Sequence, residues 1–263
     1  MKRTIPTSVA QAILLLILPV IIISPVFLIF RDYITNELFE ILFIFLYTFT
    51  ILLVVWIKNG SFAYTKISGI LDGEKAKTAK NTLFLLAIIS IIVIRFGINI
   101  KNLSFRTPTD SIPYHAPSYL LFFSAVLFGP ILEEVIFRKI ILTGLLSRYS
   151  PFKAIIYTSL LFGCMHYHPI QSIVQAFFAG IILSIVFYAS GKLWICILFH
   201  SFANILGFAF SYLRSIPKLQ FLHNNDYKII SSILCSILIV YLIKRMYDIL
   251  SLSTSKKGVN ERR

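Results

Sequence analysis

Long apolar runs separated by short polar segments dominate the chain as far as about residue 250. A helix needs about 20 mostly apolar residues to cross the hydrocarbon core of a bilayer. Most of the runs reach that length, so the pattern predicts an all-α, polytopic transmembrane helical bundle with about eight spans. The expected spans are 10–30, 38–57, 82–100, 118–146, 152–167, 170–190, 193–213 and 228–250. The fifth is short. The long fourth span is expected to continue past Arg138 and Lys139, because neither Pro nor Gly occurs between these two residues and Gly144.

Composition supports a membrane protein. Of the 263 residues, 57% are hydrophobic and 14% are charged, and the mean hydropathy is +0.84. Soluble domains have about 45–50% apolar and about 25% charged residues. Lys2 and Arg3 before the first apolar run resemble the start of a signal peptide. That run is longer than the apolar region of a signal peptide, and no small-residue cleavage site follows it, so we expect it to remain as the first span.

The net charge of +14 is distributed as in a membrane protein rather than in a nucleic-acid-binding protein. In the predicted topology, one side of the membrane collects 18 Lys and Arg residues and the other collects 6. Cytoplasmic loops of membrane proteins carry an excess of positive charge. We therefore expect a multi-pass protein of the plasma membrane with both termini in the cytoplasm, the bilayer as a partner and no binding of nucleic acid. The Ile-, Lys- and Asn-rich composition suggests a bacterial source.

Two adjacent carboxylates lie well inside the fourth predicted span. Glu133 and Glu134 occur in the segment LFGPILEEVIFRKIIL. A charged side chain at the centre of a spanning helix costs about 2.5–3.5 kcal/mol on insertion scales, and such residues usually mark functional sites. Glu134 and Arg138 are four residues apart and can pair along one helix face. Glu133 has no such partner in its own helix, so we expect it to face water or a polar residue of another helix.

Two other predicted spans carry polar residues. His166 lies near the end of the fifth span, and His200 and Asn204 share one face of the seventh because they are four residues apart. A single intramembrane His or Asn is often an interhelical hydrogen bond. The whole set is harder to explain by packing, because a salt bridge accounts for Glu134 and Arg138 but not for Glu133 together with two histidines.

These residues carry a resemblance to a known family. Glu133-Glu134-x-x-x-Arg138, Phe162-x-x-x-His166 and His200-x-x-x-Asn204 resemble, in order, the three motifs of the CAAX prenyl endopeptidase and bacteriocin-processing (CPBP, or Abi) intramembrane proteases. Ras-converting-enzyme-like proteases belong to this family. The resemblance divides the chain into N-terminal helices and loops at 1–117, a protease core at 118–213, and a last helix with a basic tail at 214–263. Lys139 departs from the pattern, because many relatives have Gly there.

The resemblance implies an intramembrane endopeptidase. Glu133, assisted by His166, would activate the water that attacks the peptide bond, and His200 and Asn204 would stabilise the oxyanion. Glu134 and Arg138 would support the site. A carboxylate in a medium of low dielectric constant is a stronger base, which suits the first role. Neutral His and Asn side chains can donate hydrogen bonds to an oxyanion, which suits the second.

A metal-free site is the preferred interpretation, and a zinc site is the alternative. Glu133, His166 and His200 are acceptable zinc ligands, but the chain has no HExxH motif. His168 is a weaker candidate ligand, because it is expected near the membrane edge. Cys164, Cys196 and Cys235 lie in apolar runs without metal-ligand spacing, so we interpret them as small buried hydrophobic residues.

Two functions of other classes remain open. One is a proton-coupled transporter that uses Glu133 and the histidines as a relay, although neither internal repeats nor broken helices support it. The other is a non-catalytic membrane scaffold or immunity protein. For the protease, the expected substrate is a peptide or lipidated protein, in the processing of a peptide, pheromone or bacteriocin, or in self-immunity.

Two features outside the motifs also give predictions. Arg95, within the third span, either extends to the outer membrane interface or faces the cavity, and we favour the interface. Gly180-x-x-x-Ser184 on the sixth span is a pair of small residues typical of closely packed helices.

Overall fold

The computed structural model describes residues 5–30, 35–60, 71, 76–97, 118–166, 170–215 and 225–260. All regular elements within these residues are helices, as the apolar pattern predicts. Six of them are long and apolar enough to cross a membrane: Val9–Phe30, Ile41–Asn59, Lys77–Arg95, Tyr119–Leu146, Ile170–Ser190 and Leu193–Leu213. The prediction of a multi-pass helical membrane protein is therefore confirmed.

Two of the eight expected spans differ from these six. The fifth corresponds to α7, Pro151–Met165, which is apolar but has only 15 residues. At about 1.5 Å per residue it is shorter than the hydrocarbon core. The eighth lies within α10, Asn225–Asn260, a helix of 36 residues that continues into the basic segment near the C-terminus.

The helices pack as two units, which are described separately. The first contains Met1–Lys66 and Pro117–Thr158, and the second contains Ile67–Ala116 and Ser159–Arg263. Each unit combines segments that are far apart in the sequence. The apolar pattern does not indicate this division, and the three consecutive segments expected from the motifs stay a prediction.

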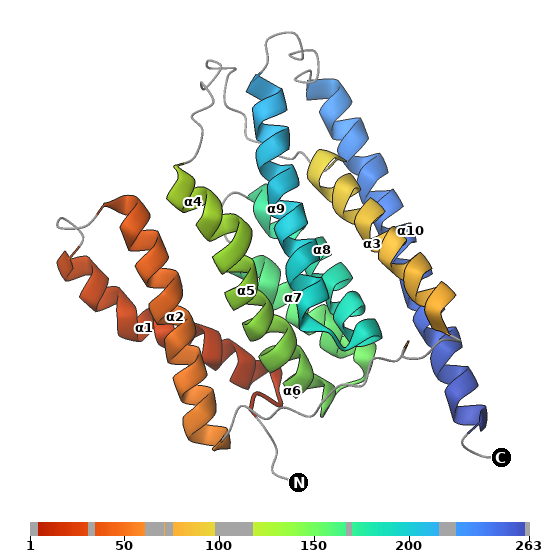
Figure 1. The fold of residues 1–263 in the computed structure, drawn as a ribbon, viewed down its shortest axis with the longest axis horizontal. Coiled ribbons are helices and arrows are strands. Elements are labelled where there is room, and N and C mark those ends of the chain that lie inside the picture. Colours follow the sequence, from red (N-terminus) through yellow and green to blue (C-terminus); the bar gives the residue numbers. More distant parts are fainter. Residues whose placement is uncertain are drawn as a thin grey trace. The chain divides into compact units, whose positions relative to one another are not determined.

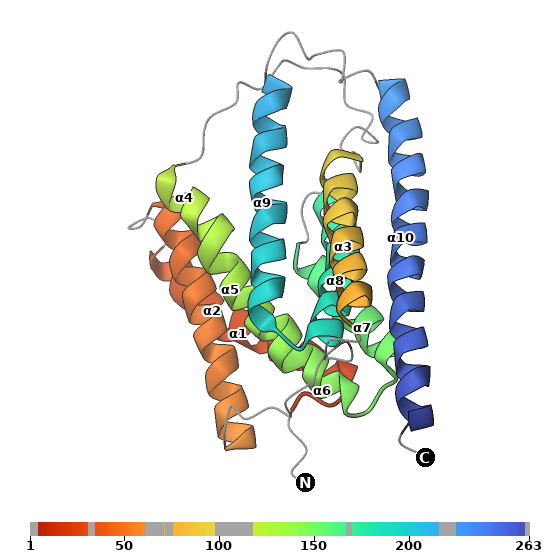
Figure 2. The same cartoon turned by 45° about the vertical axis from the view of Figure 1, so that its right-hand side comes forward.

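In the first unit, α1 (Val9–Phe30) and α2 (Asn36–Asn59) lie side by side (Figures 1 and 2). Phe27 and Phe39 meet edge to face with ring centroids 4.6 Å apart. The buried Tyr47 hydroxyl donates to the Leu16 carbonyl over 2.9 Å. Large apolar side chains remain exposed on both helices, for example Leu28 at 72% and Phe49 at 62%. Such surfaces suit contact with lipid.

The long fourth span also belongs to the first unit. It continues from Tyr119 to Leu146 without a break, as predicted. Its five successive segments are α4 (Tyr119–Phe123), the π-helical η4 (Ser124–Phe128), α5 (Gly129–Glu134), the π-helical η5 (Val135–Leu142) and α6 (Thr143–Leu146). The π-helical turns were not expected. In a π-helix, bonds close over five residues instead of four, and such turns are frequent at functional sites.

In the second unit, α3 (Lys77–Gly97) lies beside α10 in both views (Figures 1 and 2). The Ser232 hydroxyl of α10 donates to the Gly97 carbonyl of α3 over 3.1 Å. The helix α8 (Ile170–Ser190) is the most buried of the six candidate spans, with 61% of its most apolar stretch buried against 22–28% for the others. It therefore forms the centre of the packing.

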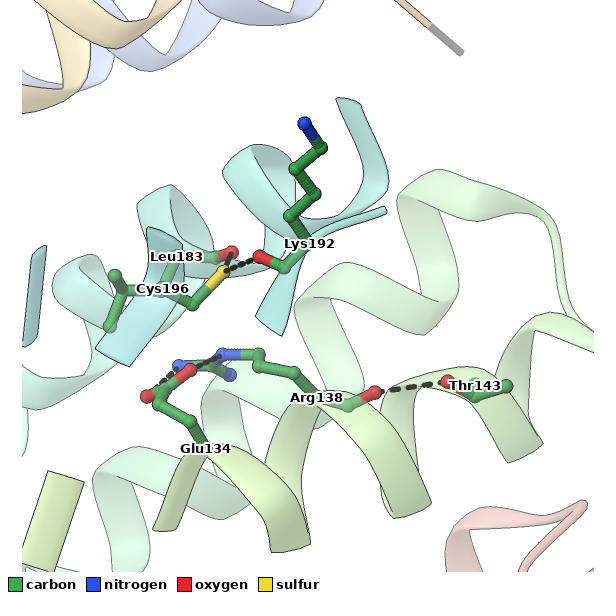
Figure 3. Close-up of polar contacts among 6 residues, drawn as sticks. All are labelled: Glu134, Arg138, Thr143, Leu183, Lys192 and Cys196. Carbon is green, nitrogen blue, oxygen red and sulfur yellow. Dashed lines mark hydrogen bonds and ion pairs between the residues drawn. The ribbon is translucent and has the colours of Figure 1, made fainter. Parts of the chain in front are cut away.

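The helix α8 packs closely against both α7 and the following helix. Gly180 approaches α7 so closely that a Cβ atom on it would lie 3.1 Å from Ser159 Cα, which confirms the close packing predicted from the Gly180 and Ser184 pair. Gly191, with a φ of 65°, turns the chain from α8 into α9 (Leu193–Ser215). The Cys196 thiol of α9 is buried and contacts the Leu183 carbonyl of α8 over 3.5 Å (Figure 3). The expectation of buried cysteines is confirmed for Cys196, whereas it is wrong for Cys164, which is exposed, and Cys235 is only half-buried.

Candidate active site

The helix that carries the two glutamates widens immediately before Pro130. The Gly129 amide donates to the Ser124 carbonyl, five residues earlier. Proline has no amide hydrogen, and its ring clashes with the carbonyl four residues before it in an α-helix. The wider turn Ser124–Phe128 accommodates Pro130 within a continuous helix. The π-helical turn changes the rotation of the following helical segment about its axis, and thereby the directions of the Glu133 and Glu134 side chains.

Glu134 and Arg138 form the predicted ion pair. Arg138 Nε donates to Glu134 Oε2 over 2.8 Å, and Arg138 Nη2 reaches Glu134 Oε1 over 3.4 Å (Figure 3). Both side chains are 0% exposed. The Thr143 hydroxyl donates to the Arg138 carbonyl over 3.0 Å, which satisfies a backbone acceptor within the π-helical segment η5. The pairing inferred from the spacing is confirmed, and its role as support for catalysis stays a prediction.

Glu133 lies in a different environment from its neighbour. Its side chain is half-buried, whereas that of Glu134 is fully buried. Its Oε1 lies 3.7 Å from the position that a Cβ atom on Gly129 would take. Side chains on a helix point back toward its N-terminus, so the Glu133 carboxylate extends over Gly129, one turn earlier. The absence of a side chain at Gly129 leaves room beside this carboxylate.

In the second unit, the Phe162 ring contacts the rings of both predicted histidines. Its ring centroid lies 4.7 Å from that of His166 and 5.7 Å from that of His200. Phe162 is 1% exposed and His200 is 6% exposed, while His166 is half-buried. The structure therefore brings His166 of α7 and His200 of α9 to one aromatic ring, although 34 positions separate them along the chain.

The tautomer of His166 follows from its contact with the backbone. His166 Nδ1 lies 2.8 Å from the Phe162 carbonyl oxygen. A carbonyl oxygen can only accept a hydrogen bond, so Nδ1 must carry the hydrogen. In the neutral ring, Nε2 then has the lone pair and can accept a hydrogen bond from a water. This is the form that assistance to a nucleophilic water requires.

Asn204 lies one turn after His200 on α9, and its amide is held by Arg95 of α3. Arg95 Nη2 donates to Asn204 Oδ1 over 2.6 Å, and Arg95 Nη1 lies 3.5 Å from Gln175 Oε1 of α8. The prediction that Arg95 extends to the membrane interface is wrong. The amide oxygens of Asn204 and Gln175 provide hydrogen-bond acceptors inside the unit, so the guanidinium is solvated there by protein groups.

The described residues thus form two polar groups. One contains Glu133, Glu134 and Arg138, and the other contains His166, His200 and Asn204. Among the residues that the structure describes, no three His, Cys, Asp or Glu side chains are grouped as they would be around a metal ion. His168, the weaker candidate ligand, lies outside the described residues.

Sequence reasoning did not assign a site role to Arg95 or to Gln175. A signal for Gln175 was present, because Gln171 and Gln175 are four residues apart in an otherwise apolar helix and both are buried. For Arg95, a single cation near a span end fits an interfacial position equally well. Only the three-dimensional positions of α3, α8 and α9 distinguish the two.

Comparison with known proteins gives a family match in the central part of the chain. Residues 115–206 match the family model described as type II CAAX prenyl endopeptidase Rce1-like. No curated protein and no solved structure shows a significant match to the chain. The matched segment contains all six residues predicted for the site, from Glu133 to Asn204.

Proposed function

We propose that the chain, a member of the Rce1-like type II CAAX prenyl endopeptidase family through residues 115–206, is an intramembrane endopeptidase that cleaves a peptide or lipidated-protein substrate. The observation that carries the proposal is the grouping around Phe162. His166 with a defined tautomer, His200 and, one turn later, Asn204 are polar groups in an apolar bundle. Placing such groups in a membrane is costly, and they occur where chemistry or transport needs them.

The proposed reaction begins with Glu133 as the general base. Its carboxylate accepts a proton from a water molecule while the water oxygen forms a bond to the carbonyl carbon of the scissile peptide bond. His166 Nε2 accepts a hydrogen bond from the same water and orients it. This step requires the Glu133 carboxylate and the His166 ring to reach one water molecule.

The negative charge that develops on the carbonyl oxygen needs donors. In the proposal, an N–H of His200 and the Nδ2 amide of Asn204 donate to that oxygen. Loss of one such donor typically lowers the rate by about 10²–10³-fold. The C–N bond then breaks, the proton held by Glu133 passes to the leaving nitrogen, and the products are a carboxylic acid and an amine.

Glu134 and Arg138 have a supporting role in this proposal. Their ion pair neutralises two buried charges and fixes the Glu134 carboxylate on Arg138, so that the adjacent Glu133 is the carboxylate assigned to the base. The biological process that we propose is the processing of a peptide, pheromone or bacteriocin, or self-immunity. We also propose the topology with both termini in the cytoplasm, from the distribution of Lys and Arg.

Cleavage by the purified protein in liposomes tests the proposal. The probes are an internally quenched, farnesylated CAAX peptide, the same peptide without the farnesyl group, and a hydrophobic leader-type peptide. Glu133→Gln and His166→Ala should each abolish cleavage of any peptide that the wild type cleaves, while Asp248→Asn, a carboxylate of α10, should leave it unchanged. Equal cleavage by Glu133→Gln and the wild type would refute the mechanism, and equal biological activity would favour the scaffold.

The same preparation tests the involvement of a metal. We propose a metal-free reaction, in which the zinc content measured by inductively coupled plasma mass spectrometry is well below one ion per chain and a chelator leaves cleavage unchanged. Stoichiometric zinc whose removal abolishes cleavage would instead assign Glu133, His166 and His200 as ligands.

A further inference from the structure

The Arg95 guanidinium occupies a position inside the second unit where three helices meet. It extends from α3, contacts the amide oxygens of Gln175 on α8 and Asn204 on α9, and lies against the backbone of α9. A Cβ atom on Gly207 would be 3.5 Å from both Arg95 Cζ and Nη1, which is ordinary van der Waals contact. The guanidinium therefore packs beside the Gly207 backbone of α9, one turn from Asn204, with enough room for a methyl group at this position.

Gln175 is itself fixed in orientation. Its Nε2 donates to the Ile94 carbonyl over 3.3 Å, and its side chain is only 8% exposed. Because the amide nitrogen is directed to Ile94, the amide oxygen is directed to Arg95. The guanidinium is thus held from one side by Gln175 and from the other by Asn204.

Among the residues that the structure describes, Arg138 forms an ion pair with Glu134. No carboxylate of these residues lies within ion-pair distance of Arg95. A charged side chain in a spanning helix that has only amide acceptors is costly. The cost indicates that Arg95 does something that a neutral residue does not. The shortest contact of Arg95, 2.6 Å to Asn204 Oδ1, indicates that this role concerns the Asn204 amide.

The contact determines the orientation of the Asn204 amide. An asparagine amide has an accepting oxygen on one side and a donating nitrogen on the other, and the two orientations have nearly the same shape. Arginine has only donors, so the oxygen of Asn204 must face Arg95. The Nδ2 hydrogens are consequently directed to the opposite side, and the charged bond to Oδ1 polarises the amide and strengthens it as a donor.

We infer that Arg95 is a positioning residue that holds the Asn204 amide in the orientation in which Nδ2 donates to the oxyanion. The inference rests on the proposed function. Arg95 touches neither substrate nor reacting atoms in this account, because it acts through Asn204. Gln175 has the same role one step further away, since it directs the Arg95 guanidinium.

A double-mutant cycle in the cleavage assay tests this assignment. Arg95→Met should lower kcat about 10–100-fold, the loss typical when a hydrogen-bond partner that orients a metal-binding side chain is removed, and should leave KM unchanged. Arg95→Lys should recover part of the loss, because lysine still donates to Oδ1. Asn204→Ala should lower kcat about 10²–10³-fold. The double variant Arg95→Met/Asn204→Ala should be no slower than Asn204→Ala alone, because Arg95 then has no amide to orient.

Controls separate this result from a general loss of structure. Arg148→Met removes an arginine that lies over the Tyr149 ring of the first unit and should leave kcat unchanged. If Arg95→Met does not fold, Gln175→Leu replaces it in the cycle, with a smaller loss that is likewise absent in the Asn204→Ala background. Losses that multiply in the double variant, or a change confined to KM, would overturn the assignment of Arg95. Cleavage that persists in Glu133→Gln would instead overturn the proposed function and this inference with it.

Discussion

The rings of Phe162 and His200 pack edge to face, with centroids 5.7 Å apart and an interplanar angle of 82°. The same Phe162 ring contacts His166, and the Phe162 carbonyl accepts from His166 Nδ1. One residue of α7 therefore sets both the spacing of the two histidines and the tautomer of one of them. The phenylalanine of the second motif has a structural reason to be aromatic.

Replacement of Phe162 by leucine should lower cleavage more than it lowers stability. Leucine keeps most of the apolar volume, but it lacks the ring that both histidines contact, so their spacing becomes less well defined. We expect kcat to fall at least about tenfold, since small misplacements of catalytic groups are costly. The matched control is Phe84→Leu, which removes a similar edge-to-face contact with Phe199 of α9, at 5.8 Å. Equal effects of the two variants on kcat would contradict the role of Phe162.

The tautomer of His166 gives a second prediction. Asparagine at this position can still donate to the Phe162 carbonyl, but it has no group at the place of Nε2. Glutamine can reach that place with its amide. We therefore expect His166→Asn to lower kcat about 10²–10⁴-fold, the usual contribution of general acid–base assistance, and His166→Gln to lower it less. Stopped-assay kinetics on the cleaved peptide would decide, and a more active Asn variant would contradict the assignment of Nε2.

The buried ion pair predicts an unusual pattern of stability. Glu134→Leu or Arg138→Met alone leaves one buried charge without its partner, which typically costs about 3–5 kcal/mol. The double variant removes both charges and should recover most of that loss, because replacement of a buried pair by apolar residues is often neutral. Unfolding of the detergent-solubilised protein, followed by the fluorescence of Trp56 and Trp194, measures all three. Additive destabilisation in the double variant would show that the pair has further essential contacts.

Sequence reasoning predicted the parts of the structure that depend on local spacing. The apolar runs gave the spanning helices, and the interval of four residues gave the ion pair of Glu134 with Arg138. The same interval placed His200 and Asn204 on one face of α9. In each case a single helix contains all the residues involved, so the geometry of that helix is sufficient.

The contacts between helices that sequence reasoning missed depend on segments that are distant in the sequence. Nothing in the segment around Arg95 indicates that amide oxygens from α8 and α9 surround its guanidinium. The π-helical turns near Glu133 were also missed, because the pattern of apolar residues hardly differs between a π-helical and an α-helical turn. The position of Pro130 is, in retrospect, a local reason for the first of these turns.

Close packing at Gly180 supports the same histidine pair and gives the last prediction. A Cβ atom at this position would lie 3.1 Å from Ser159 Cα and 3.3 Å from Phe162 Cδ1. Because Ser159 Cα is backbone, α7 must move away from α8 to admit the methyl group. Gly180→Ala should therefore destabilise the protein by about 1–3 kcal/mol, as overpacking of a core does, and should lower kcat by displacing Phe162.

Gly207→Ala is the control for Gly180→Ala. At this position of α9 the nearest heavy atoms would lie 3.5 Å from the added Cβ, so the methyl group fits in ordinary contact. We expect its melting temperature to equal or exceed that of the wild type, because alanine favours the helix over glycine by about 1 kcal/mol. A stable Gly180→Ala variant with normal kcat would mean that α7 and α8 can separate without moving Phe162, and the histidine spacing would then have to be fixed from α9 alone.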